Sequence, residues 1–188
     1  MMRKAWALAA TVGLLFSSPV AASPAAASYP VAGLDQSVQL LLDKWGVPHI
    51  YARSASDAFL AQGFNAARDR LFQIDLWLRT GTGTLSEALG PKFVDKDRAA
   101  RLFLYRGDMQ REWESYGPEG KQAAVRFASG VNAYLDWLKD NQGALPEEFR
   151  KLGYQPRRWS PEDVVRIRMH GLSYNLQSEI ERAAVACA

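Results

Sequence analysis

The sequence has few of the residues that most often cross-link a chain or bind a metal. It contains one cysteine, Cys187, which excludes an intrachain disulfide. Its two histidines, His49 and His170, are far apart, and neither lies in an HExxH or CxxC pattern. The sequence therefore offers no cluster of metal ligands, and we interpret His49, which follows Pro48 in a predicted strand, as a structural residue.

Two common catalytic motifs are also missing. There is no GxSxG nucleophile elbow and no phosphate-binding loop. The glycine-rich run at residues 81–84 has no following lysine, so we predict that it ends a helix. No set of residues forms a complete catalytic site.

The N-terminal residues have the order of a secretory signal peptide. Arg3 and Lys4 precede the apolar run AWALAATVGLLF and then the small-residue stretch SSPVAASPAAAS. Ala22 and Ala27 are both plausible last residues of the signal. The apolar run of about 12 residues is shorter than the roughly 20 that a membrane-spanning helix needs, which disfavours an uncleaved anchor. We predict a signal peptide over residues 1–27, export to the periplasm or beyond, and a mature part over 28–188 without a membrane span.

The charge of the mature part is close to neutral. Residues 1–27 hold two basic and no acidic groups, which leaves 21 basic and 20 acidic residues. A chain with this balance has no basic face of the kind that binds nucleic acid.

The remaining pattern predicts a β-hairpin followed by helices. The segments 37–43 and 47–52 read as two short strands around a turn at Lys44-Trp45-Gly46, with Val38, Leu40 and Leu42 on one face. From Ser56 the apolar residues recur at helical spacing as far as Gly81 and Gly83. That stripe consists of Leu60, Phe64, Ala67, Leu71, Ile74 and Leu78.

Further helices are expected over 97–113, from Pro118 to about Gly143, and from Ser160 to about Ala184, with a short helical turn at 84–90 and a connector over 144–159. Ser160 has the features of an N-cap. The fold class is α+β, helix-rich. Because a lone hairpin is only marginally stable, we expect the strands to complete a sheet supplied by another segment.

Several fragments together resemble the penicillin acylase family. They are DKWGVPHIYA, AQGFNAARDRLFQIDLWLRTGTGTLSEALG, the Asp97…Arg101 pair, GVNAYLDWL, LPEEFRKLGYQPRRW with SPEDV, and LSYNLQSEIER, in family order over roughly residues 38–182. The resemblance implies an exported precursor that cuts itself into α and β subunits, with an αββα N-terminal-nucleophile fold completed by the β subunit. The chain would be the α-subunit portion. The nucleophile, a serine that opens the β subunit, would then lie outside it, so no catalytic residue is assigned here.

The same resemblance implies substrate-binding residues in the last helix. Met169 and Ser173 match positions that line the acyl pocket in penicillin G-cleaving members, where the second position is a phenylalanine. Leu172 stands where those enzymes have an arginine. Both departures favour a longer or more apolar acyl group, so an acyl-homoserine lactone or lipopeptide is an alternative to a β-lactam. Met169, Leu172 and Ser173 fall in one helical arc with Leu176 and Ile180, which could also be ordinary core.

Three further residue sets have structural or metal-binding interpretations. Glu179 matches an α-subunit carboxylate that ligates calcium in several members, the other ligands coming from the β subunit; the alternative is a solvated glutamate beside Arg182. Asp69-Arg70 is expected to form a buried or half-buried polar network. Asp97 and Arg101 are expected to pair at i, i+4.

Two function classes therefore remain open. The first is an amide hydrolase that acts on N-acyl compounds. The second is a truncated, non-catalytic exported helical protein that kept the binding helix.

Overall fold

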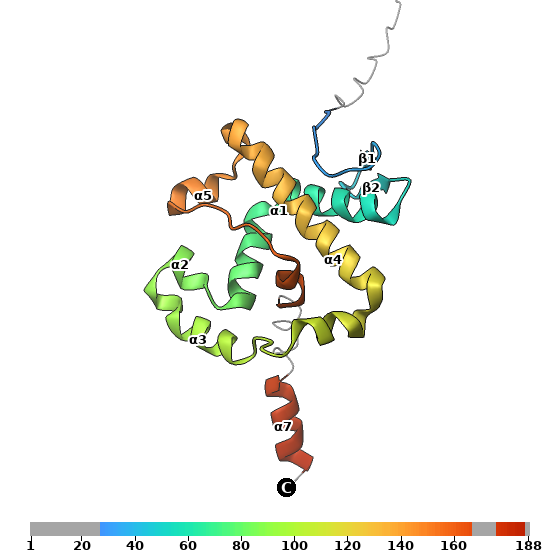
Figure 1. The fold of residues 1–188 in the computed structure, drawn as a ribbon. Helices are drawn as coiled ribbons and strands as arrows, with labels where there is room; N and C mark the ends of the chain where they lie inside the picture. Colours follow the sequence, from blue (N-terminus) through green and yellow to red (C-terminus); the bar gives the residue numbers. More distant parts are fainter. Residues whose placement is uncertain (1–26, 167–175, 187–188) are drawn as a thin grey trace, which may run out of the picture.

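The computed structural model describes residues 27–166 and 176–186, and it shows a helix-rich chain with one small sheet (Figure 1). This confirms the predicted helix-rich α+β class. The predicted signal peptide lies outside the described residues, apart from Ala27. Within the described part, none of the helices combines the length and the apolar character that a bilayer crossing requires.

The predicted hairpin is present. Strand β1 (Gln39–Leu42) pairs antiparallel with β2 (Pro48–Tyr51), with Leu40 opposite Ile50. The carboxylate of Asp43 stabilises the turn, because it accepts hydrogen bonds from the backbone N–H groups of Trp45 and Val47 at 2.8 and 2.9 Å. Of the three residues predicted on one face of the first strand, Val38 and Leu40 are half-buried, whereas Leu42 is 52% exposed.

Helix α1 (Ala55–Thr82) follows the predicted apolar stripe, and all six residues of that stripe are buried. Ser54 caps its first turn by accepting a hydrogen bond from the backbone N–H of Asp57 at 3.0 Å. Its C-cap is Gly83, at φ 65° and ψ 44°, the left-handed conformation that glycine adopts at low cost. The helix is kinked at Arg70, where φ is −139° and ψ is 29°.

Helix α4 (Met109–Asp140) crosses α1 at very short range (Figure 1). A Cβ atom on Gly63 of α1 would lie 2.0 Å from the carbonyl oxygen of Phe127, and one on Gly130 of α4 would lie 2.0 Å from that of Leu60. The two glycines thus let the backbones approach where any side chain would hold them apart. Helix α4 is interrupted at Gly117, with φ 72° and ψ 172°, and continues from Pro118.

The predicted helix over 97–113 is confirmed at its two ends and is wrong over residues 103–108, where the structure has a break. The structure has α2 (Leu85–Leu89), the short helix η1 (Pro91–Phe93) and α3 (Val94–Leu102), and residues 103–108 are not helical. Asp108 begins the next helix, because its side chain accepts a hydrogen bond from the N–H of Gln110 at 2.9 Å. A new helix therefore begins at Asp108, which follows Gly107, although the apolar residues keep a helical spacing through this region.

The predicted connector 144–159 also contains a helix, α5 (Glu147–Leu152), after the short helix η2 (Gln142–Ala144). The connector packs closely on α4 at Asn132. The side-chain amide of Asn132 donates to the carbonyl oxygen of Trp159 at 2.8 Å and accepts from its N–H at 3.0 Å. The main core lies between α1, α4 and this connector, and it is rich in edge-to-face aromatic pairs such as Phe64–Tyr134 and Phe72–Phe149.

Candidate functional site

The predicted pocket residues Met169, Leu172 and Ser173 lie outside the described residues. Glu179 is in helix α7 (Leu176–Ala186), but its side chain is also outside the description. Ile180, which belongs to the same predicted arc, is 61% exposed, so it is not part of a core formed by the described residues. The structure does describe the residues that precede the predicted pocket residues in the chain, up to residue 166. We call these preceding residues the frame, and the helix predicted from Ser160 the pocket segment.

That segment begins with a helix start, as predicted at Ser160. Residues 161–166 are helical, and the carboxylate of Asp163 accepts a hydrogen bond from the N–H of Ser160 at 2.7 Å. Asp163 is 1% exposed. Its Oδ1 atom also forms ion pairs with the guanidinium groups of Arg157 at 3.3 Å and Arg166 at 3.2 Å. A buried carboxylate with these donors keeps its charge compensated and fixes the direction in which the segment leaves the connector.

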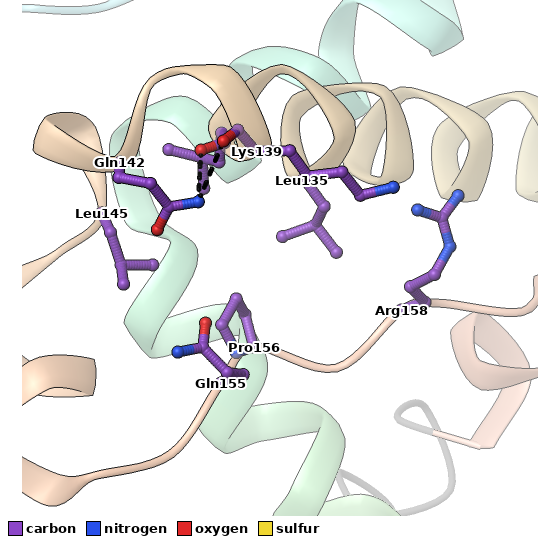
Figure 2. Close-up of a pocket in the computed structure, with 8 residues that line it drawn as sticks. Leu135, Lys139, Gln142, Leu145, Gln155, Pro156 and Arg158 are labelled. Carbon is purple, nitrogen blue, oxygen red and sulfur yellow. Dashed lines mark hydrogen bonds between the residues drawn. The ribbon is translucent and has the colours of Figure 1, made fainter.

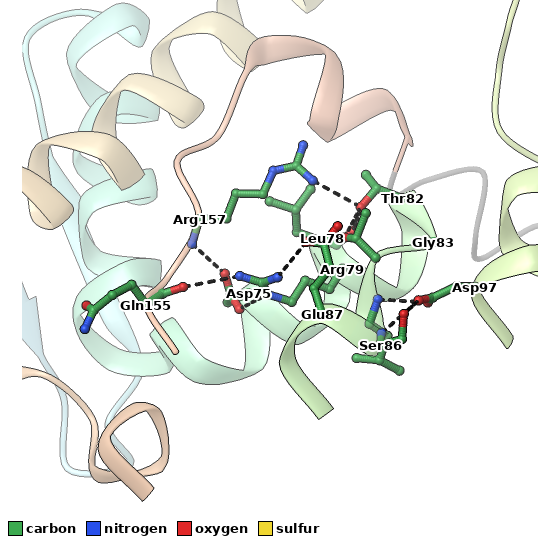
Figure 3. A network of polar contacts seen from close by, with 12 residues as sticks. Asp75, Leu78, Arg79, Thr82, Gly83, Ser86, Glu87, Asp97, Gln155 and Arg157 are labelled. Atoms are coloured by element: carbon green, nitrogen blue, oxygen red, sulfur yellow. Dashed lines mark hydrogen bonds and ion pairs between the residues drawn. The ribbon is translucent and has the colours of Figure 1, made fainter. Parts of the chain in front are cut away.

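A second buried ion pair ties the connector to α1. Asp75 is 1% and Arg79 is 7% exposed, and Arg79 Nε donates to Asp75 Oδ2 at 2.8 Å. Arg79 also donates to the carbonyl oxygen of Gln155 at 3.2 Å, and its guanidinium lies 4.8 Å from the ring centre of Tyr154. Asp75 accepts the backbone N–H of Arg157 at 2.8 Å. Figure 3 shows Asp75 and Arg79 of α1 with their hydrogen bonds to Gln155 and Arg157, which hold the connector against α1.

Burial raises the pKa of the Tyr154 hydroxyl to about 12, and the nearby Asp75 carboxylate adds to this effect. Tyr154 therefore stays neutral at physiological pH and contributes packing and the cation–π contact. The Asp75–Arg79 network was not predicted from the sequence. Its only signal in the sequence was an acid and a base at i, i+4 inside the apolar stripe of α1.

The buried or half-buried polar network predicted at Asp69-Arg70 is wrong as to burial. Both residues are exposed at the kink of α1. Asp69 accepts hydrogen bonds from Asn65 Nδ2 at 3.2 Å and from Arg68 Nε at 3.1 Å. The bulk of the core is on the opposite side of α1, which leaves this dipeptide on the surface.

Asp97 and Arg101 bind the turn that follows α1, a different arrangement from the predicted i, i+4 ion pair. Asp97 accepts hydrogen bonds from the N–H groups of Leu85 and Ser86, both at 2.8 Å, and from the Ser86 hydroxyl (Figure 3). Arg101 Nε donates to the carbonyl oxygen of Gly83 at 2.8 Å. Burial would raise the pKa of Asp97, but the hydrogen bonds from Ser86 and Leu85 outweigh it and hold the pKa below its usual value.

The described part has several surface hollows. Figure 2 shows one of about 200 Å³ between the end of α4 and the connector, with Leu135, Leu145 and Pro156 around it and Lys139 and Arg158 at its edge. Both cations contact Asp136, at 2.7 Å each. A larger groove of about 840 Å³ follows the hairpin and reaches Arg68. Neither lining brings together a nucleophile and a base, and the described residues contain no group of three or more acidic, histidine or cysteine side chains placed to hold a metal ion.

Comparison with known proteins gives consistent results at the level of sequence and fold. A family model described as penicillin amidase matches residues 37–188. Penicillin G acylase of Escherichia coli is 32% identical over 155 residues, which are 80% of this chain and 18% of the relative. The acyl-homoserine lactone acylase QuiP of Pseudomonas aeruginosa is 32% identical over 166 residues, 87% of this chain and 19% of the relative.

A solved structure, a thermostable penicillin G acylase from Alcaligenes faecalis, superposes with a TM-score of 0.70 at 29% identity. The match covers 79% of this chain and 80% of the matched chain. The chain spans about a fifth of the length of the curated relatives it matches.

Proposed function

The chain belongs to the penicillin amidase family, and from that premise we propose that it is the α-subunit portion of an exported amide hydrolase. The observation that carries the proposal is the family match over residues 37–188, supported by the similarity of the described fold to a penicillin G acylase structure. Residues 1–27 would be removed as a signal peptide, and the enzyme would work in the periplasm or outside the cell.

In this proposal a β subunit from the same precursor supplies the chemistry. The hydroxyl oxygen of its N-terminal serine attacks the amide carbonyl of the substrate, and the proton passes to the serine's own α-amino group, whose ordinary pKa is about 8. The amine product leaves with that proton. Water then hydrolyses the acyl-enzyme, which releases a carboxylic acid and restores the serine.

The contribution of this chain is to hold one wall of the acyl pocket. Met169, Leu172 and Ser173 would line that wall, and the described frame supports it, because Asp163 fixes the helix start at Ser160 and Arg157 links that start to α1. The small Ser173 and the apolar Leu172 leave room for an aliphatic acyl chain. Relatives of both kinds, penicillin acylases and acyl-homoserine lactone acylases, match this chain at similar identity.

The hairpin would complete the proposed αββα fold. Leu41, Trp45 and Tyr51 are 46%, 79% and 58% exposed, an apolar surface that a further strand and its side chains would cover.

Glu179 is proposed as one calcium ligand. Calcium takes six to eight oxygen ligands, and the described residues hold no carboxylate cluster that could form such a site by themselves. The remaining oxygens would have to come from the β subunit.

Two measurements test the function. The DNA downstream of the codon for Ala188 should continue in frame to a serine codon that opens a new subunit; a stop codon there would favour the non-catalytic helical protein. The full-length enzyme should then hydrolyse acyl amides, with a higher kcat/KM for a dodecanoyl than for a phenylacetyl amide of the same amine. The opposite order would favour an aromatic acyl group and a β-lactam substrate.

A further inference from the structure

A hollow of about 250 Å³ lies between helix α1 and the residues that precede and begin strand β1. Much of its lining is apolar and includes Tyr29, Val38, Leu40, Ala61 and Phe64. Three of these residues, Tyr29, Val38 and Leu40, also line the larger groove that follows the hairpin. The hollow is therefore continuous with that groove and extends it towards α1. We call it the α1 hollow.

Asn65 of α1 brings a buried polar group to the lining of the α1 hollow. It is 6% exposed, and its Nδ2 atom donates a hydrogen bond to Asp69 Oδ2 at 3.2 Å. This bond fixes the orientation of the amide, because the reverse orientation would place Oδ1 against a carboxylate. Oδ1 is buried and accepts no hydrogen bond from the described residues. Since a buried acceptor without a donor is costly, the arrangement favours a donor that another molecule supplies.

Arg68 adds a second polar group where the α1 hollow and the hairpin groove meet, since it lines both. Its side chain is 21% exposed, and its Nε atom donates to Asp69 Oδ1 at 3.1 Å. A guanidinium has five N–H donors, so Arg68 can also donate to an acceptor in the groove. A peptide unit carries one N–H and one C=O, which are the donor that Asn65 lacks and an acceptor for Arg68.

We propose that an extended segment of the β subunit lies in the hairpin groove, places an aliphatic side chain in the α1 hollow and donates a backbone N–H to Asn65 Oδ1. The inference rests on the proposed function, which supplies the β subunit. The shape of the groove favours a polypeptide over a small ligand, because the six consecutive residues 37–42 line it. The chain also spans about a fifth of the length of the curated relatives it matches, which leaves most of such a protein to supply the segment.

Photo-crosslinking in the full-length, processed enzyme identifies the occupant. Ser37 is exposed and lines both the α1 hollow and the groove. We expect p-benzoylphenylalanine placed at Ser37 to cross-link to one peptide of the β subunit, which mass spectrometry identifies. The control places the same probe at Ser115, an exposed residue of α4 outside both linings, and it should not capture that peptide. Cross-links only within this chain, only to a second copy of it, or to no protein would overturn the inference.

Asn65→Leu tests the hydrogen bond, because leucine is of similar size and has no acceptor. We expect it to raise the rate at which the subunits of the processed enzyme separate in urea by about tenfold, the effect of one hydrogen bond. The matched control is Asn141→Leu. Asn141 is half-buried and also donates one hydrogen bond within the chain, to the carbonyl oxygen of Trp137 at 2.8 Å, but it lines neither the α1 hollow nor the groove.

An equal separation rate for the Asn65 and Asn141 variants would overturn the assigned hydrogen bond. If Asn65→Leu does not fold, the cross-link at Ser37 decides alone. A wild-type enzyme that hydrolyses acyl amides but gives no cross-link from Ser37 to its β subunit refutes this inference and leaves the proposed function standing. A precursor that never yields a β subunit refutes the proposed function and, with it, this inference.

Discussion

At the scale of single residues, the close crossing of α1 and α4 depends on two glycines. A methyl group at Gly63 would lie 2.0 Å from the carbonyl oxygen of Phe127, and α1 and α4 cannot separate without opening the core between them. We expect Gly63→Ala to destabilise the protein by about 2–3 kcal/mol. A urea unfolding curve measures this, with Gly143→Ala as the control, because a Cβ at Gly143 meets no atom within 4 Å. A midpoint equal to that of wild type would show that the helices cross differently.

Asp57 gives a residue-scale prediction about pH. The backbone N–H of Asp35 holds the pKa of this carboxyl below its usual value, with further help from Gln36, Ser54 and Arg126. A lowered pKa stabilises the folded state above the unfolded pKa of about 3.9, and this stability is lost as the pH falls through the folded pKa. The urea midpoints of wild type and Asp57→Asn should therefore differ most above about pH 5 and converge as the pH falls through the lowered pKa of the folded state.

The control for this pH dependence is Asp95→Asn. The Asp95 side chain is 94% exposed and 3.4 Å from Arg98, so its removal should change the midpoint little at any pH. If the difference in urea midpoint between wild type and Asp57→Asn stayed constant down to pH 3, the hydrogen bonds to Asp57 would not depend on an ionised carboxylate.

At the scale of elements, the backbone conformation of Gly117 causes the break in α4. Its φ of 72° with ψ of 172° lies in a region that other residues rarely adopt, and a Cβ there would meet no atom within 4 Å. The cost of Gly117→Ala thus comes from the backbone alone, about 1–3 kcal/mol. Thermal unfolding measures it, again against Gly143→Ala. A neutral result would mean that residues 109–140 form one continuous helix.

The elements also show which features the sequence could predict. The stripe of α1, its end at Gly83, the hairpin and the helix start after Ser160 all follow from local chemistry, and they were predicted correctly. The Asp75–Arg79 network was not, because its partner carbonyl at Gln155 lies 76 positions away, a distance that no local pattern encodes. The helix predicted over 97–113 was wrong in its middle for the opposite reason. Helical periodicity over a long window concealed the local helix cap at Asp108.

At the scale of the whole molecule, the hairpin leaves several large apolar side chains exposed in the described part of the chain. Leu42 is 52% exposed on β1, and Leu152, at the end of α5, is 45% exposed. If the hairpin joins a larger sheet, a charge at position 42 must be buried in that sheet, whereas a charge at 152 remains in water. A buried unpaired carboxylate costs several kcal/mol.

We therefore expect Leu42→Glu to reduce the yield of processed, assembled enzyme by at least about tenfold, while Leu152→Glu leaves it near wild type. Gel filtration of periplasmic or culture extracts, followed by separation of the two subunits, measures the yield. The chain expressed alone provides the second arm. There both substitutions should have small, similar effects on the urea midpoint, because both positions are half-exposed within the chain. Normal assembly of Leu42→Glu would show that β1 faces solvent in the complete enzyme and that the sheet is completed elsewhere.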